Sequence, residues 1–122
     1  MNSFVYGCHK AANSGLLSWT KTRLLPKIFA SMTPLFTFKD CRFKIDKCKL
    51  NTARVVCWNE LKITNSFTLE TSLYGKTFVA ENSENFQDTI QMTLDDYHDI
   101  AKNLLLSISY YNSLEPELEL EF

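Results

Sequence analysis

The sequence predicts an α/β chain from two kinds of hydrophobic pattern. Apolar residues recur at helical spacing in residues 18–32 and again after Thr93. Residues 35–45 instead alternate apolar and polar side chains, which is typical of half-buried strands. The 122 residues are 45% hydrophobic and 22% charged, and this ordinary globular composition excludes a collagen-like, low-complexity or wholly disordered chain.

Three segments favour β-strands. Residues 3–6 combine serine with phenylalanine, valine and tyrosine, and the run ends at Gly7. The alternating residues 35–45 predict one or two strands with a turn near Asp40. Residues 63–73 predict a further strand, because isoleucine, phenylalanine and leucine side chains recur on one face.

Two segments favour helices. Pro26 interrupts the helical pattern of residues 18–32, and proline is best tolerated in the first turn, so this helix is expected to begin near Pro26 or to kink there. Thr93 is a candidate N-cap for the last helix, because two aspartates follow it where the helix dipole favours anions. The apolar stripe of this helix predicts an end near Tyr110.

The remaining segments are less regular. The valines of residues 53–61 favour a strand, whereas Thr52 in front of them favours a capped helix, so both structures stay open at this point. Residues 75–91 are polar and predict a surface loop. Residues 113–122 alternate acidic and apolar side chains and predict an acidic tail beyond a domain that covers residues 1–112.

The sequence predicts a cytoplasmic protein. It has no run of about 18 apolar residues that would span a membrane, and its start lacks the charged and apolar regions of a secretory signal. Without such a signal, the four cysteines are expected to be free thiols in a reducing compartment. These cysteines are Cys8, Cys41, Cys48 and Cys57.

The net charge of −1 conceals two oppositely charged halves. Residues 1–62 contain eleven Lys and Arg against three Asp and Glu, which gives +8. Residues 63–122 contain two against eleven, which gives −9. Such a division indicates either a basic surface for an anionic partner or two ordinary solvated faces.

The residue types exclude several common sites. His9 and His98 are far apart, neither belongs to a short paired-histidine motif, and no C-x-x-C pair occurs, so the pattern predicts no zinc site made by this chain alone. Three scattered glycines make no phosphate-binding loop. Residues 39–54 mix bases with phenylalanine, but a basic sheet face explains this better than single-stranded nucleic acid does.

Glu70 is the candidate catalytic residue. Alternation places it in the last predicted strand on the face shared with Thr68 and Ser66. A carboxylate near a strand end is held rigidly and can be aimed into a cleft, which suits a general base. The alternative from residue type alone is an ordinary exposed glutamate.

Several segments together resemble the cytosolic carboxypeptidases, relatives of carboxypeptidase A that trim glutamate from tubulin tails. The most specific block is TARVV-x-W followed by NSFTLE. The resemblance covers roughly residues 2–110 and keeps the family's order and spacing. The segments are SFVYGC, RLLPKIFA, FTFKDCRFKIDKCK, TARVVCWNELKITNSFTLETSLYG and the helix after Thr93.

The resemblance implies part of a three-layer α/β/α sandwich with a mixed sheet, whose N-terminal half is missing. In the family, an H-x-x-E motif and a later histidine hold zinc, and both precede the region that this chain resembles. The chain is therefore expected to hold no zinc alone and to be an inactive fragment of a zinc metallocarboxypeptidase. The resemblance also favours a helix for residues 53–61.

Two site residues follow from matching positions. Glu70 matches the family's general base, which takes a proton from zinc-bound water and passes it to the leaving amine. Arg54 matches a basic residue of the pocket for an acidic C-terminal side chain, with a purely structural arginine as the alternative. No Tyr lies between Lys39 and Trp58, where digestive carboxypeptidases carry a substrate-capping tyrosine.

The expected function is removal of C-terminal glutamate from proteins, with acidic C-termini such as tubulin tails as partners. The basic half of the chain would attract such tails. Neither nucleic acid nor membrane is an expected partner. The alternative is a non-catalytic pseudoenzyme or partner-binding fragment.

Overall fold

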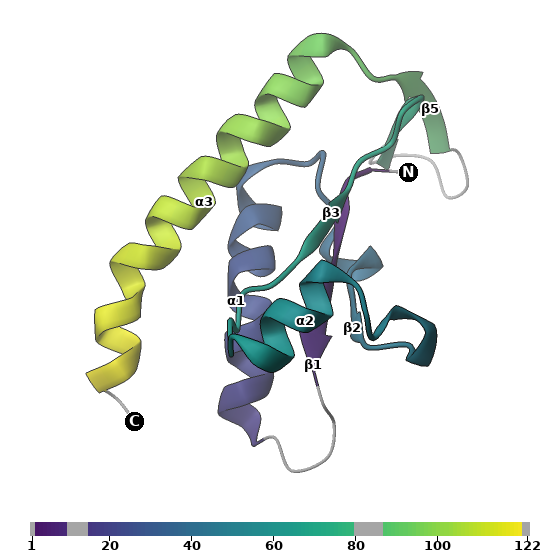
Figure 1. The fold of residues 1–122 in the computed structure, drawn as a ribbon. Coiled ribbons are helices and arrows are strands. Elements are labelled where there is room, and N and C mark those ends of the chain that lie inside the picture. Colours follow the sequence, from purple (N-terminus) through teal and green to yellow (C-terminus); the bar gives the residue numbers. More distant parts are fainter. Residues whose placement is uncertain (1, 10–14, 80–86, 121–122) are drawn as a thin grey trace.

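A computed structural model describes residues 2–9, 15–79 and 87–120. The fold is mixed α/β, as the sequence predicts, while the three-layer sandwich stays a prediction (Figure 1). Two short 3-10 helices lie on either side of β2, at Phe38–Asp40 and Lys47–Lys49. In chain order the strands and α-helices are β1 (Phe4–His9), α1 (Leu16–Met32), β2 (Arg42–Lys44), α2 (Ala53–Glu60), β3 (Thr68–Glu70), β4 (Gly75–Val79), β5 (Gln87–Gln91) and α3 (Leu94–Leu120).

β1 is the central strand of a three-stranded mixed sheet. It lies parallel to β2 and antiparallel to β3. The register pairs Phe4 with Glu70 and Tyr6 with Thr68. Because successive side chains of a strand point to opposite faces, these four residues share one face and Val5 points to the other. The two faces therefore have different roles, one lining a cavity and the other packing into the core.

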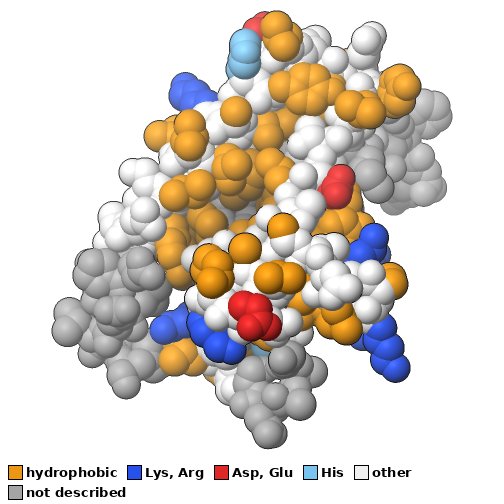
Figure 2. Space-filling model, viewed as in Figure 1, with side chains coloured by type: hydrophobic (Ala, Val, Ile, Leu, Met, Phe, Trp, Pro, Cys, Tyr) orange, Lys and Arg blue, Asp and Glu red, His pale blue; other side chains and the backbone are white. Residues whose placement is uncertain are grey.

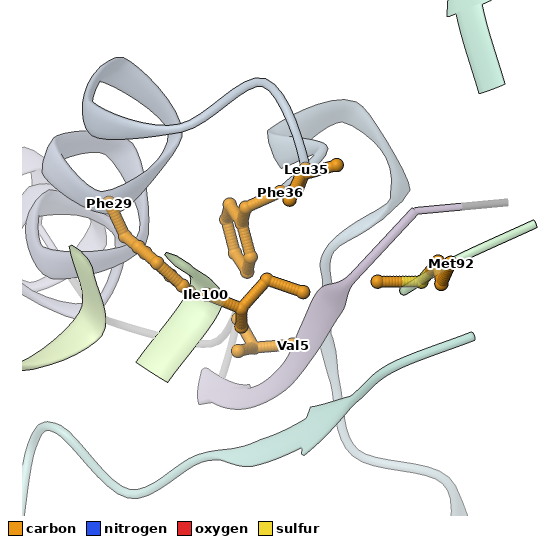
Figure 3. Packing of buried hydrophobic residues seen from close by; sticks show 6 residues of the cluster. All are labelled: Val5, Phe29, Leu35, Phe36, Met92 and Ile100. Carbon is orange, nitrogen blue, oxygen red and sulfur yellow. The ribbon is translucent and has the colours of Figure 1, made fainter. Parts of the chain in front are cut away.

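The core lies on the Val5 face of this sheet (Figure 3). Phe29 of α1 and Ile100 of α3 pack into the same cluster, and the rings of Phe29 and Phe36 lie 4.3 Å apart. α1 contacts both α3 and β1, so the two helices cover this face of the sheet. The buried residues of the cluster are Val5, Phe29, Leu35, Phe36, Met92 and Ile100.

β1 continues past Gly7 to His9, which corrects the predicted strand end. A β-carbon at Gly7 would lie 2.6 Å from Cδ1 of Phe43 and 3.1 Å from Cε1 of Phe67. The glycine is therefore required for close packing within the strand, and it does not end the strand.

α1 begins at Leu16, ten residues before Pro26, so the prediction that it begins near the proline is wrong. Pro26 lies inside the helix and is buried. Packing of α1 against β1 and α3 can compensate for the backbone hydrogen bond that a proline removes.

α2 confirms the helix that the resemblance favours for residues 53–61. Thr52 occupies the N-cap position, and the backbone N–H of Val56 donates to its carbonyl oxygen over 3.0 Å. Val55 is fully buried, whereas Val56 is 42% exposed. Burial of one helix face therefore overrides the β-propensity of the two valines.

Between α2 and α3 the structure differs from two sequence predictions in the lengths of the strand and of the loop. The strand predicted over residues 63–73 contains only β3, because Lys62 has a φ of 56° and a turn follows it. The predicted loop over residues 75–91 contains an antiparallel hairpin of β4 and β5. Residues 80–86 lie outside the described residues.

α3 begins after Thr93, as predicted, and extends to Leu120 instead of ending near Tyr110. Thr93 and Asp96 cap its start reciprocally: the Thr93 N–H donates to Asp96 Oδ2 over 2.8 Å, and the Asp96 N–H donates to Thr93 Oγ1 over 3.4 Å. The helix thus includes most of the predicted acidic tail, whose last two residues lie outside the described residues.

Apolar side chains gather along α3 and in the region between α3 and α2 (Figure 2). Leu105 is 69% exposed and Leu106 is 49% exposed. Among the described residues, no helix combines the length and apolar character that crossing a membrane requires.

Candidate functional site

Glu70 and Arg54 line one cavity of about 520 Å³. It lies on the sheet face that carries Tyr6 and Thr68, opposite the Val5 face. β3 supplies Glu70, and the first turn of α2 supplies Arg54. The structure thus brings together the two site residues that the sequence predicts from separate segments. The full lining is Tyr6, Arg42, Lys44, Asp46, Lys49, Thr52, Arg54, Thr68 and Glu70.

Glu70 is an exposed residue at the last position of β3. Its backbone is held by pairing with Phe4 of β1. Within the described residues, its carboxylate accepts no hydrogen bond and forms no ion pair. The backbone is therefore fixed while the carboxylate stays available for proton transfer.

Arg54 is anchored to β1. Its Nη1 donates to the backbone oxygen of Gly7 and lies 3.3 Å from Sγ of Cys8. Its guanidinium carbon lies 5.9 Å from the centroid of the Tyr6 ring, and its Nε is buried without a hydrogen-bond partner. Arg54 therefore has a structural role as well as a position in the cavity wall.

Three further cations line the cavity, namely Arg42, Lys44 and Lys49. The register that pairs Arg42 with Tyr6 places it on the cavity face. Together with Arg54 they make four positive charges in the described lining, against the two negative charges of Asp46 and Glu70. Within the described residues none of the three forms an ion pair. The cavity wall is therefore positively charged and suits an anionic ligand.

Sequence reasoning missed these three cations as site residues. The sequence pattern predicts only a basic sheet face for this segment. The signal was the alternation in Arg42–Lys44, where one phenylalanine separates two bases, because that pattern buries the ring and exposes both charges.

Cys8 contacts Arg54 of the cavity wall and is fully buried. Burial raises its pKa, and the neighbouring Arg54 lowers it by a smaller amount. All four cysteines lie in the described part of the chain and none forms a disulfide.

The expectation that this chain holds no zinc by itself stays a prediction. Nowhere in the described ranges do three or more His, Cys, Asp or Glu side chains come together as a metal site. His9 lies in β1 and His98 in α3, so the two histidines belong to different elements.

A search against protein-family models finds no match. Among curated proteins, cytosolic carboxypeptidase 4 of Mus musculus is 37% identical over 84 residues, which is 61% of this chain and 8% of the relative. Cytosolic carboxypeptidase 2 of Macaca fascicularis is 36% identical over 86 residues, 70% of this chain and 10% of the relative. Cytosolic carboxypeptidase 1 of Homo sapiens is 36% identical over 84 residues, 61% of this chain and 7% of the relative.

The chain spans only 7–10% of the length of these three relatives. Sequence identity of 36–37% to cytosolic carboxypeptidases 1, 2 and 4 confirms the family that the sequence motifs indicate. The chain is part of a domain of the cytosolic carboxypeptidase family.

Proposed function

We propose that this chain is the part of a cytoplasmic metallocarboxypeptidase domain that binds an acidic C-terminus and supplies the general base. The observation that carries the proposal is the shared cavity of Glu70 and four cations. Removal of C-terminal glutamate from acidic protein tails, such as those of tubulin, is the reaction that this charge pattern supports best.

The cations would bind the substrate. The Arg54 guanidinium would donate to a substrate carboxylate through Nη2, because Nη1 is engaged with β1 and Nε is buried. Its bonds to β1 hold one edge of that group in place. Lys49 and Arg42 add positive charge on the same wall, which favours glutamate over neutral C-terminal residues.

Glu70 would transfer the proton. Its carboxylate accepts a proton from the attacking water and returns it to the amine that leaves when the peptide bond breaks. Proton transfer by a positioned side chain contributes about 10²–10⁴ in rate. The fixed backbone of β3 limits how far the carboxylate can move from the cavity.

The second candidate function is binding of the same acidic ligands without hydrolysis. The four lining cations support it, because they would attract a carboxylate whether or not hydrolysis follows. A chimera separates the two candidates: the matched segment of mouse cytosolic carboxypeptidase 4 is exchanged for that of this chain. Release of C-terminal residues by the folded chimera supports the first candidate, and a folded chimera without it supports the second.

A binding experiment tests acid recognition on the chain itself. A fluorescein-labelled peptide of five glutamines with a C-terminal glutamate is titrated against the chain, and the same peptide with a C-terminal glutamine serves as comparison. We expect the glutamate peptide to bind about tenfold tighter. Equal affinities would contradict recognition of an acidic C-terminus.

A further inference from the structure

A second cavity of about 430 Å³ lies between α1 and β2. Four cations line it, namely Arg23, Lys39, Arg42 and Lys44, and none of the described residues that line it is acidic. Its aromatic walls are Trp19, Phe38 and Phe43. The function proposed above does not use this cavity, although two of its cations, Arg42 and Lys44, also line the Glu70 cavity.

Arg23 is held in a fixed orientation. Its guanidinium carbon lies 4.5 Å from the centroid of the Trp19 ring and 4.3 Å from that of Phe43. Its Nη1 donates to the Trp19 backbone oxygen over 3.0 Å and to Thr22 Oγ1 over 2.9 Å. Both rings and both hydrogen bonds restrict the side chain without neutralising its charge.

The charge of Arg23 has no carboxylate partner in the described part of the chain. Partial burial lowers its pKa, and no carboxylate of the described residues pairs with it. An oriented, partly desolvated arginine in a wall of cations is suited to receive an anion from a ligand.

The shared cations connect the two cavities. Arg42 and Lys44 are two residues apart on β2, which corresponds to about 6.6 Å along a strand. Alternate side chains of an extended peptide have the same spacing. The two cavities lie on opposite faces of the sheet, and β2 is an edge strand of the described sheet. A peptide whose C-terminal residue lies near Arg54 would pass over Arg42 and Lys44 at this edge and reach the second cavity with its upstream acidic side chains.

The aromatic residues of this cavity favour a peptide over nucleic acid. A single-stranded nucleic acid needs open ring faces on which bases stack. Here Arg23 covers a face of both Trp19 and Phe43, and Nζ of Lys27 lies 5.1 Å from the centroid of the Phe38 ring. Phe43 is also buried. The rings thus serve to position cations.

We propose that the cavity around Arg23 is an accessory subsite that binds an upstream acidic side chain of the peptide whose C-terminus occupies the Glu70 cavity. This inference rests on the function proposed above. It assigns specificity for runs of acidic residues to Arg23, in addition to recognition of the last residue by Arg54.

Two labelled peptides test the subsite on the 122-residue chain at 150 mM salt. One contains six glutamates, and the other contains five glutamines before a C-terminal glutamate. Arg23→Gln should weaken binding of the six-glutamate peptide about tenfold or more and binding of the other peptide less than twofold. Lys21→Gln is the matched control on the same helix and should change either affinity less than twofold.

Circular dichroism and thermal melting of each variant check the fold, and Arg23→Lys should retain part of the affinity because it keeps the charge. Equal weakening of both peptides, or no weakening, would overturn the subsite. If a six-residue oligothymidylate bound more tightly than the six-glutamate peptide, and this binding depended on Arg23, the assignment of the subsite to a peptide would be overturned. Arg23-dependent binding of the six-glutamate peptide without preference for a C-terminal glutamate would retain the subsite and reject the proposed function.

Discussion

Nη1 of Arg54 lies 3.3 Å from Sγ of Cys8, and it also donates to the backbone oxygen of Gly7. The arginine thereby connects the start of α2 to the central strand of the sheet. The same side chain lines the cavity that contains Glu70. Arg54 therefore contributes to packing and, under the proposed function, to ligand recognition.

Arg54→Ala is expected to destabilise the chain as well as weaken binding. Hydrogen bonds to charged groups contribute about 1.5–3 kcal/mol, and the substitution also leaves the Gly7 oxygen without this donor. Urea unfolding should show a loss within that range. Lys49→Ala, an exposed cation of the same cavity, is the control and should leave the free energy of unfolding nearly unchanged.

The four thiols should differ in their rates of alkylation. Cys48 is exposed and should react first with iodoacetamide, whereas Cys8 is fully buried and burial raises its pKa. Mass spectrometry of a time course at pH 7.5 measures the order. Early labelling of Cys8 in the folded chain would contradict this packing of β1 against α2.

Lys76 and Asp96 should make the stability of the chain depend on pH. Nζ of Lys76 lies 2.6 Å from Oδ1 of Asp96, and this bond together with the Thr93 N–H holds the pKa of the carboxyl below its usual value. Because the pKa of Asp96 is lower in the folded chain than in the unfolded chain, its charged form stabilises the fold at pH values above the unfolded pKa of about 4. This contribution is lost as the pH falls through the folded pKa.

Asp96→Asn is the corresponding variant. It should melt at a lower temperature than the parent at pH 7, and the difference should shrink as the pH falls below about 4. Asp95→Asn, on the neighbouring exposed position, should show a smaller effect at pH 7. A pH-independent difference for Asp96→Asn would exclude the ion pair as its cause.

Gly7→Ala should destabilise the sheet and loosen Arg23. The added methyl group would lie 2.6 Å from the ring of Phe43, so that ring must move, and overpacking of this kind costs about 1–3 kcal/mol. Because Phe43 also contacts the Arg23 guanidinium, binding of the six-glutamate peptide should weaken too. Unchanged stability would show that the ring has room to shift.

Sequence patterns predict those helices and strands that are determined by residues close together in the sequence. Thr93 and Asp96 form a reciprocal cap from neighbouring residues. Part of the apolar stripe after them packs in the core, with Ile100 buried and Tyr97 and Leu104 against it. The helical end at Leu120 was missed because alternating acidic and apolar residues favour no defined end. The β4–β5 hairpin was missed because its polar strands lack the alternation that marks a half-buried strand.

The candidate site was only partly predictable. The family resemblance predicts Glu70 and Arg54 as site residues. Their shared cavity depends on pairing between β1 and β3 and on the placement of α2. The anchoring of Arg54 to Gly7 connects residues 47 positions apart, and no local pattern indicates it. Tertiary contacts of this kind set the geometry of the cavity.

Turnover by the chimera tests the central claim that Glu70 is the catalytic base. The chimera is mouse cytosolic carboxypeptidase 4 with its matched segment exchanged for that of this chain. Glu70→Gln in the chimera should lower kcat by about 10² or more with an unchanged melting temperature, because an amide does not accept the proton. Glu60→Gln, an exposed glutamate at the end of α2, should leave kcat unchanged. Equal turnover of the Glu70→Gln and Glu60→Gln variants would contradict the account.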